Sequence, residues 1–216
     1  MYLPNAFRET NFLAIAGLIA RHPLATLITL QGGQIVADHI PFLLDSQGKL
    51  LRAHVARANP LWQRFDASCE AVAIFTGVDH YVSPSWYPSK RETGKVVPTW
   101  NYEAVHVYGR MRAIDDVHWV HSLVHDLTEH HESGRPKPWT LEDAPGEFIA
   151  AELNAVVGIE ISVSRIEAKR KFSQNRTAAD RNGVIEGLLT EVDEDAKALA
   201  RAMSSNQPAP DADKQN

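Results

Sequence analysis

The pattern of apolar and polar residues along the chain alternates between strand-like and helical periods. Apolar residues at 13, 15, 18 and 19 have helical spacing, and Asn11 can cap the helix that they predict. Six later segments are β-branched and apolar, or alternate as strands do: 24–30, 34–44, 49–57, 71–78, 99–113 and 155–163. Pro41 indicates that the second strand lies at a sheet edge or carries a bulge. In the third strand, alternation places Arg52 and His54 on one face.

Helical patterns occupy the ends of the chain and the gaps between these strands. We predict helices at 11–22, 61–65, 115–133 and 145–153, from Thr177 onward, and at 191–203. Asp115 or Asp116 can cap the helix that ends near Ser133. The segment beginning at Thr177 resembles a capping box, although Gly183 and Gly187 weaken the helix that follows it.

This order of elements predicts an α+β fold with a mainly β core. Five strands lie between residues 24 and 113 and are joined mostly by short turns, which is typical of a closed or split antiparallel barrel. Residues 155–163 can supply a sixth strand, and the chain continues extended through Lys171. We therefore predict a single domain over 1–203 with peripheral and C-terminal helices. Residues 204–216 have almost nothing to bury and are predicted to be a disordered tail.

Composition and charge narrow the possible functions. Hydrophobic residues make up 44% of the 216-residue chain and charged residues 23%, as in ordinary globular proteins. No apolar run is long enough to span a membrane, and no secretory signal is visible, so we expect a cytoplasmic protein. A single cysteine, Cys69, agrees with a reducing compartment. The net charge of −5 gives no global attraction to nucleic acid.

The segment from Tyr81 to Tyr108 combines rigid backbone with aromatic and polar side chains. Pro84, Pro88 and Pro98 make the middle of this segment a shaped loop, because proline fixes φ and removes a backbone donor. Broad aromatic faces and hydrogen-bonding groups follow one another here: Trp86, Tyr87, Trp100 and Tyr102 with Ser83, Ser85, Ser89, Thr99 and Asn101. This mixture suits a planar ligand with polar edges. The alternative is a rigid surface loop held in place by its aromatic residues.

A second polar segment, Lys171 to Arg176, lies between the last strand and a helix start. A helix N-terminus presents unpaired N–H groups and a partial positive charge, to which Lys171, Arg176 and the Ser173 hydroxyl add further anion-binding groups. The segment is consistent with phosphate binding, and equally with an ordinary solvated helix cap.

Other familiar chemistries have little support. Five histidines lie between His118 and His131, and His121 and His125 have the spacing of a chelating pair, but no third ligand is placed with them. We therefore predict no metal site. His54 and His106 lie on predicted strands, where a single histidine is more often a structural residue than a ligand contact. Motifs for a nucleophile elbow, a Walker loop or a dinucleotide-binding glycine loop are absent from the sequence.

Five separated motifs, in this order, resemble the PaiB-like family of FMN-binding proteins, often labelled negative transcriptional regulators. They occupy residues 1–7, 54–60, 81–87, 97–102 and 171–176. This family belongs to the pyridoxamine-phosphate-oxidase-like split-barrel group. The resemblance implies a six-stranded split barrel that forms a homodimer, with FMN held in a groove at the dimer interface.

The same resemblance implies a set of cofactor-binding residues. These are Arg52, His54, Ser83, Ser85, Trp86, Thr99, Trp100, Asn101, Lys171, Ser173, Gln174 and Asn175. Cations and hydroxyls would hold the phosphate, amides the polar edge of the isoalloxazine, and aromatic side chains its face. Arg52, Lys171 and Arg176 compete for the phosphate, and we favour Arg52 with Lys171. No catalytic residue is identified.

Three functions follow from the resemblance. A negative transcriptional regulator would act through flavin or partner sensing, because the sequence shows neither a helix-turn-helix nor a basic face for direct DNA binding. An FMN-dependent oxidoreductase of the flavin-reductase type is the alternative, and it needs no nicotinamide fingerprint. A haem-binding or haem-degrading split barrel is the third, which the histidines of the 115–133 helix keep open.

Overall fold

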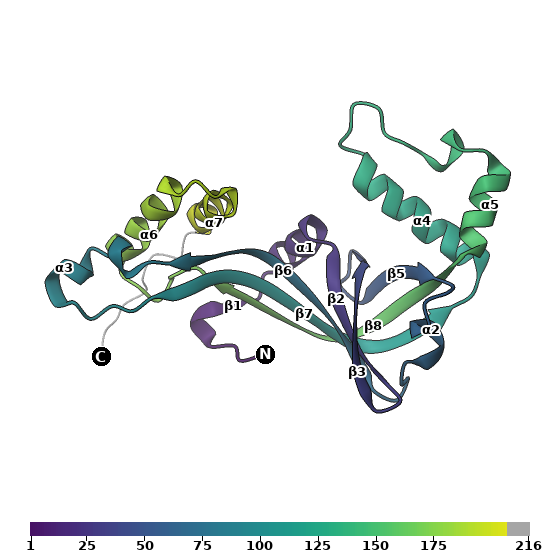
Figure 1. The fold of residues 1–216 in the computed structure, drawn as a ribbon, viewed down its shortest axis with the longest axis horizontal. Coiled ribbons are helices and arrows are strands. Elements are labelled where there is room, and N and C mark those ends of the chain that lie inside the picture. The colour runs from purple at the N-terminus through teal and green to yellow at the C-terminus, as the bar shows by residue number, and fades with distance from the viewer. Residues whose placement is uncertain (207–216) are drawn as a thin grey trace. The chain divides into compact units, whose positions relative to one another are not determined.

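A computed structural model describes residues 1–206 of the chain (Figure 1). Its strands are β1 (Arg8–Glu9), β2 (Leu24–Gln31), β3 (Gln34–Pro41), β4 (Leu43–Leu44), β5 (Leu50–Ala56), β6 (Glu70–Val82), β7 (Thr99–Ile114) and β8 (Val156–Lys171). Its helices are α1 (Phe12–Arg21), α2 (Leu61–Arg64), α3 (Ser89–Thr93), α4 (Val117–Glu132), α5 (Gly146–Asn154), α6 (Ala178–Thr190) and α7 (Glu194–Ser205). Three short 3-10 helices complete the set: Asn5–Phe7, Pro84–Trp86 and Leu141–Asp143.

One sheet contains all of these strands, in the order β3-β2-β6-β7-β8-β5-β4, with β1 paired to β8. The hairpin of β2 and β3 has the predicted register, from Leu24 opposite Pro41 to Gln31 opposite Gln34, and β3 is an edge strand as Pro41 indicated. The predicted number of six strands is wrong, because the described residues form eight. The six long strands match the six predicted segments. Of the two extra strands, β1 has two residues, which is too short for a period to be seen, and β4 is the end of the predicted 34–44 strand, which the structure divides after Pro41.

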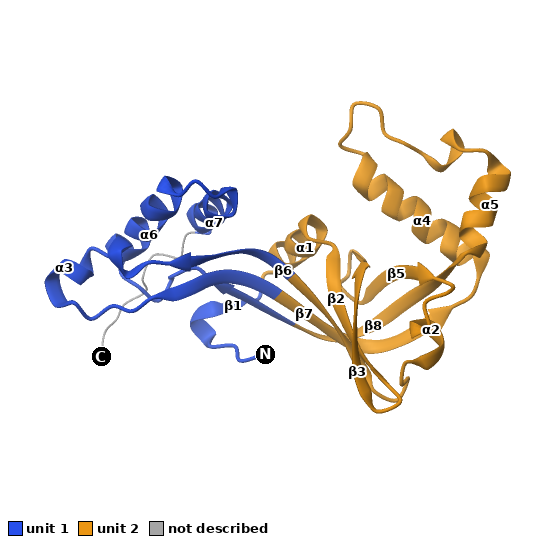
Figure 2. Ribbon diagram, viewed as in Figure 1, with its two compact units in different colours: residues 1–10, 76–104, 167–216 blue, residues 11–75, 105–166 orange. Residues whose placement is uncertain are grey.

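The chain forms two compact units (Figure 2). Unit 1 combines residues 1–10, 76–104 and 167–206, and unit 2 combines 11–75 and 105–166. The strands β6, β7 and β8 contribute residues to both. The prediction of a single domain over 1–203 stays a prediction. Of the predicted tail 204–216, Ser204 and Ser205 belong to α7, and residues 207–216 lie outside the described residues.

Unit 2 contains the predicted hairpins and α4. Its buried residues include Leu27, Phe42, Leu51, Phe75 and Ile159. The rings of Phe42 and Phe75 meet edge to face at 6.3 Å. In β5 the side chains at 51, 53 and 55 are buried while those at 52 and 54 are only partly so, which confirms the predicted alternation.

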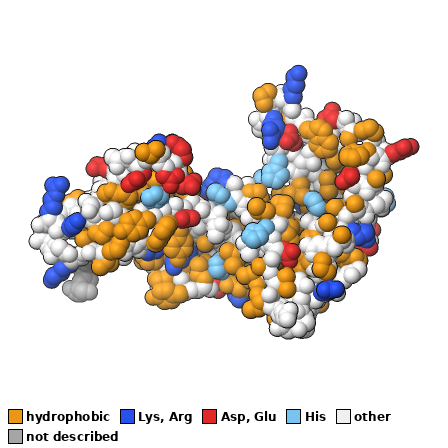
Figure 3. Space-filling model, viewed as in Figure 1, with side chains coloured by type: hydrophobic (Ala, Val, Ile, Leu, Met, Phe, Trp, Pro, Cys, Tyr) orange, Lys and Arg blue, Asp and Glu red, His pale blue; other side chains and the backbone are white. Residues whose placement is uncertain are grey.

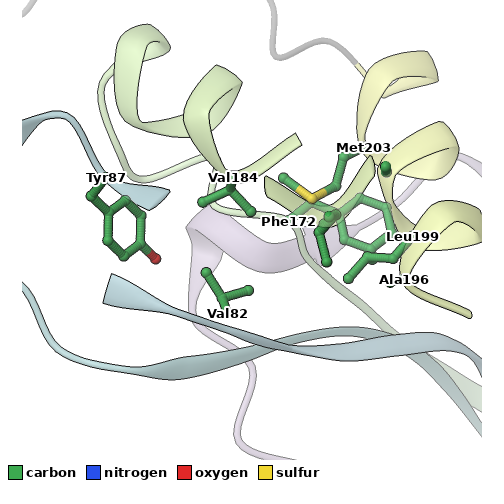
Figure 4. Packing of buried hydrophobic residues seen from close by; sticks show 9 residues of the cluster. Val82, Tyr87, Phe172, Val184, Ala196, Leu199 and Met203 are labelled. Carbon is green, nitrogen blue, oxygen red and sulfur yellow. The ribbon is translucent and has the colours of Figure 1, made fainter. Parts of the chain in front are cut away.

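Unit 1 has a hydrophobic core of its own, where α6 and α7 pack over strand residues (Figure 4). The buried cluster consists of Val82, Tyr87, Phe172, Val184, Leu188, Ala196, Leu199, Ala200 and Met203. Thr177 caps α6 as predicted, because its hydroxyl accepts a hydrogen bond from the Asp180 N–H at 3.1 Å. The two glycines that weaken α6 have a packing role. A Cβ on Gly187 would lie 2.3 Å from the Trp86 ring, and one on Gly183 would lie 2.2 Å from the Trp86 carbonyl oxygen.

Candidate functional site

In unit 1, the Lys171 side chain at the end of β8 contacts the start of β7. Its ammonium group donates one hydrogen bond to the Thr99 hydroxyl and another, of 2.7 Å, to the Trp100 carbonyl oxygen. An ammonium group has three N–H donors, so one remains for another acceptor. Burial lowers the pKa of Lys171, and the nearby charges of Lys169 and Arg176 lower it further.

These three residues, Lys169, Lys171 and Arg176, form what we call the cation cluster. Lys169 is buried, with its ammonium group 3.3 Å from the Tyr2 carbonyl oxygen and 5.1 Å from the centre of the Tyr102 ring. Arg176 lies 5.2 Å from the centre of the Tyr87 ring. Within residues 1–206, no member of the cluster forms an ion pair with a carboxylate. The cluster therefore gathers positive charge that the described part of the protein leaves uncompensated.

The neighbouring Arg170, which points to the other face of β8, shows the opposite arrangement. Its guanidinium donates to Glu103 and to Glu9, each at 3.1 Å. Glu103 is buried, with 4% of its surface exposed. Alternation along β8 thus separates a neutralised arginine from the cation cluster.

A tight turn connects β8 to α6 and contains three of the predicted site residues. Ser173 has a φ of 59°, and its hydroxyl accepts a 2.9 Å hydrogen bond from the Asn101 amide, with both residues buried. The Gln174 side chain bridges the turn, accepting from Phe172 N and donating to Arg170 O, both at 2.6 Å. Asn175 is exposed. The polar groups of Asn101, Ser173 and Gln174 therefore have partners within the protein.

The predicted residues of the 83–86 segment form a 3-10 helix in the same unit. The Ser83 hydroxyl accepts from Ser85 N at 3.2 Å, and the Ser85 hydroxyl accepts from Lys90 at 3.0 Å. Trp86 is half-buried against the glycines of α6. This 3-10 helix and α3 were not predicted, because the prolines of the segment obscure any helical period.

An exposed aromatic pair lies on the strands of the same unit. Trp100 and Tyr81 expose 54% and 41% of their surfaces, and their rings meet edge to face at 6.2 Å. Hydrophobic side chains can be seen along this part of the molecule in Figure 3. Exposed aromatic faces next to hydrogen-bonding groups are the lining that a planar ligand requires.

Two predicted residues, Arg52 and His54, belong to unit 2. Arg52 forms an ion pair with Asp126 of α4 at 2.9 Å. The His54 Nδ1 atom is buried without a hydrogen-bond partner among the described residues, and burial lowers the pKa of this imidazole. The structure thus brings together ten of the twelve predicted residues in unit 1 and places the remaining two in unit 2. Their assignment to the cofactor stays a prediction.

The sequence reasoning overlooked Lys169 as a site residue. The sequence pattern could have indicated Lys169, because residues two apart on a strand share a face and Lys169 is two residues before Lys171. On α4, His118, His121 and His125 are exposed. Among residues 1–206, no group of three or more His, Cys, Asp or Glu side chains is arranged to hold a metal ion.

The chemistry of unit 1 fits FMN. The phosphate of FMN is an anion, and a cation cluster with one ammonium donor still available matches it. Exposed aromatic side chains beside that cluster match a planar ring system.

Comparison with known proteins identifies the family. A sequence model of the family described as "Putative FMN-binding domain" matches residues 1–165. The chain belongs to this family. FMN is accordingly the cofactor that the family assignment supports, and the resemblance inferred from the five motifs is confirmed. Residues 166–206, which carry the cation cluster, lie beyond the matched segment.

A curated relative extends the match over most of the chain. The Bacillus subtilis protein named "Protease synthase and sporulation protein PAI 2" is 34% identical over 208 residues, which cover 94% of this chain and 96% of that protein. An uncharacterized protein of Emericella nidulans, AN0679, is 33% identical and covers 87% of this chain and 90% of its own length.

Solved structures confirm the fold class. The conserved hypothetical protein Rv2991 from Mycobacterium tuberculosis has a TM-score of 0.59 at 12% identity, covering 82% of this chain and 94% of that one. The FAD and haem binding protein from Mycobacterium smegmatis has a TM-score of 0.53 at 19% identity, covering 76% of this chain and 73% of that one. This FMN-binding family member is therefore an α+β protein of the split-barrel type. No helix in residues 1–206 has the length and apolar character needed to cross a membrane.

Proposed function

We propose that this chain binds FMN with the phosphate on the cation cluster and uses the bound flavin to regulate a partner. The observation that carries the proposal is the cluster of three cations, Lys169, Lys171 and Arg176, without a carboxylate partner in residues 1–206. Gathering like charges is unfavourable unless an anion compensates them. A phosphate monoester supplies that compensation.

The contacts favour Lys171 over Arg52 as the main phosphate ligand. Arg52 already has an acidic partner, Asp126, whereas Lys171 has only neutral acceptors. Trp100 and Tyr81 would contact the ring system, and Trp100 is directly linked to Lys171 through its carbonyl oxygen. When bound, FMN supplies a ring that carries one or two electrons. The homodimer implied by the resemblance and the cytoplasmic location expected from the sequence belong to the same proposal.

A regulatory role through flavin or partner sensing is supported by two observations. The name of the Bacillus subtilis relative links that protein to protease synthesis and sporulation. The net charge of −5 supplies no general attraction to DNA. Direct DNA binding is tested by titrating a DNA duplex at low and high salt. Affinity at low salt that falls steeply as salt is added would contradict regulation through a partner.

FMN-dependent oxidoreduction is the second candidate, and the exposed Trp100 ring favours it. A flavin resting on a surface aromatic residue remains accessible to an external reductant, whereas a sensor that is only bound and released needs no such access. Oxidation of NADH or NADPH that depends on added FMN would select this candidate.

The decisive experiment is a titration of the purified protein with FMN, riboflavin and haemin. The proposal predicts quenching of FMN fluorescence and a weaker affinity for riboflavin, which lacks the phosphate. A protein that ignores FMN and gains a Soret band with haemin would overturn it. Equal affinities for FMN and riboflavin would refute the phosphate site while leaving flavin binding in place.

A further inference from the structure

The turn that carries the cation cluster has an unusual backbone. Ser173 is the one non-glycine residue within 1–206 with a positive φ, at 59°. Side chains with a Cβ rarely adopt this left-handed conformation, and where they do, the surrounding structure imposes it. Ser173 is neither at a loop tip nor exposed, because only 3% of its surface is accessible.

This backbone reversal is what assembles the cation cluster. In a continuous strand, Lys171 and Arg176 would be about 17 Å apart, at roughly 3.3 Å per residue. At such a separation salt would screen their interaction almost completely. A turn that reverses the chain between the two residues brings them closer than a strand would, in agreement with the lowered pKa of Lys171, to which the charge of Arg176 contributes. The Arg176 N–H donates to the Ser173 carbonyl oxygen at 3.0 Å, which closes the turn.

One buried side chain, Asn101, holds this turn in place. Its amide donates to the Ser173 hydroxyl at 2.9 Å and lies 3.5 Å from the Met203 sulfur of α7. Asn101 is completely inaccessible to solvent, and it directly follows Thr99 and Trp100, the two residues whose oxygens accept from Lys171. A single amide thus touches the turn and α7, and it belongs to the strand segment that orients Lys171.

We propose that Asn101 is a positioning residue, which sets the geometry of the phosphate site and connects that site to α7. This inference rests on the proposed function. Asn101 does not contact the phosphate itself, because its amide is buried and is already hydrogen-bonded. Binding of the phosphate and docking of α7 stabilise the same turn, so each must strengthen the other by thermodynamic reciprocity.

The test compares Asn101→Ala with the wild-type protein using FMN and riboflavin. We expect the variant to bind FMN at least about tenfold more weakly, the usual effect of disturbing one hydrogen bond to a charged group. Riboflavin affinity should change by less than about threefold, because riboflavin has no phosphate to position. Equal losses for FMN and riboflavin would overturn the inference, since they would indicate general damage to the flavin site.

Two further variants keep the test valid if Asn101→Ala fails to fold. Ser173→Gly permits the left-handed turn but deletes the hydroxyl that Asn101 holds, and we expect the same selective loss of FMN affinity. Thr29→Ala is the matched control, because Thr29 is a buried polar residue of unit 2, and it should leave the preference for FMN unchanged. Retention of the full preference for FMN by Ser173→Gly would overturn the inference.

The connection to α7 is tested by hydrogen exchange. At saturating FMN, amides of α7 should exchange more slowly than in the free wild-type protein, and this protection should be reduced in Asn101→Ala. Equal protection in both proteins would refute the connection. A wild-type protein that binds FMN and riboflavin equally would instead refute the phosphate site of the proposed function, and with it this inference. The two failures are therefore distinguishable.

Discussion

Replacing Lys171 with methionine tests the phosphate site most directly. Methionine preserves much of the aliphatic stem and removes the charge and the N–H donors. In the wild-type protein two donors are engaged by Thr99 and Trp100, so one remains for the phosphate. Loss of one charge-assisted hydrogen bond costs about 1.5–3 kcal/mol, which corresponds to FMN binding about 10- to 150-fold weaker.

The lowered pKa of Lys171 indicates that Lys171→Met loses affinity for FMN without a large loss of stability. Its pKa in the folded protein lies below the ordinary value of 10.5. Between the two values the unfolded chain binds more protons, so the contribution of Lys171 to stability rises with pH across that window and is unfavourable below it. Removing the charge relieves this penalty, which offsets the lost hydrogen bonds. We therefore expect Lys171→Met to remain folded while it loses affinity for FMN.

The assay is fluorescence titration with FMN and riboflavin at two salt concentrations, alongside denaturant unfolding across the alkaline window. Lys95→Met is the control, because Lys95 is an exposed lysine of the same unit without a side-chain partner in residues 1–206. A change in FMN affinity of less than about threefold in Lys171→Met would refute the reasoning, since it is well below the loss expected for one charge-assisted hydrogen bond. An equal loss of affinity for FMN and for riboflavin in Lys171→Met would also refute the reasoning.

Three further changes test the packing and electrostatics around the site. Arg170→Met should destabilise the protein by about 3–5 kcal/mol in denaturant unfolding, because it leaves the buried Glu103 carboxylate without its cation. Gly187→Ala should destabilise by about 1–3 kcal/mol despite the better helix propensity of alanine, because its Cβ would meet the Trp86 ring. The folded-state pKa of His54 lies below 6.5, so stability should fall as pH drops below that value, and His54→Gln should flatten this dependence.

Each of these changes has a matched control. Adding Glu103→Gln to the Arg170 variant should recover part of the loss, because a neutral amide is less costly to bury than a lone charge. Gly134→Ala should be nearly neutral, since no atom lies within 4 Å of its added Cβ. His118→Gln, at an exposed position, should keep the wild-type pH dependence. Equal responses in a test variant and its control would contradict the corresponding argument.

The sequence predicted the long elements well because their periods extend over many residues. Asn11, Asp116 and Thr177 cap their helices as expected, each accepting a backbone hydrogen bond. The short strand β1 and the helix α3 escaped prediction because so few residues show no period, and the predicted 34–44 strand did not reveal its division into β3 and β4.

The site was less accessible to sequence reasoning. Lys171 and Arg176 could be identified as anion-binding candidates from residue type alone. The role of Asn101 could not, because its partner Ser173 is 72 residues away and their contact depends on a left-handed backbone. The packing of Trp86 against Gly187 is another contact that no local pattern reveals. In both cases the decisive information is a tertiary contact.

Unit 1 is built from three separated pieces of chain, and this has a consequence during synthesis. Strand β1 pairs Arg8 with Lys169, so its partner is translated about 160 residues later. At about 5–20 residues per second, the first residues wait on the order of ten seconds for that partner. Unit 2 ends at residue 166, so all of its residues are translated before unit 1 is complete, and it can fold earlier. A newly made chain would therefore complete the proposed flavin site last, and a chain whose synthesis stops soon after residue 166 would lack that proposed site although it contains all the residues of unit 2.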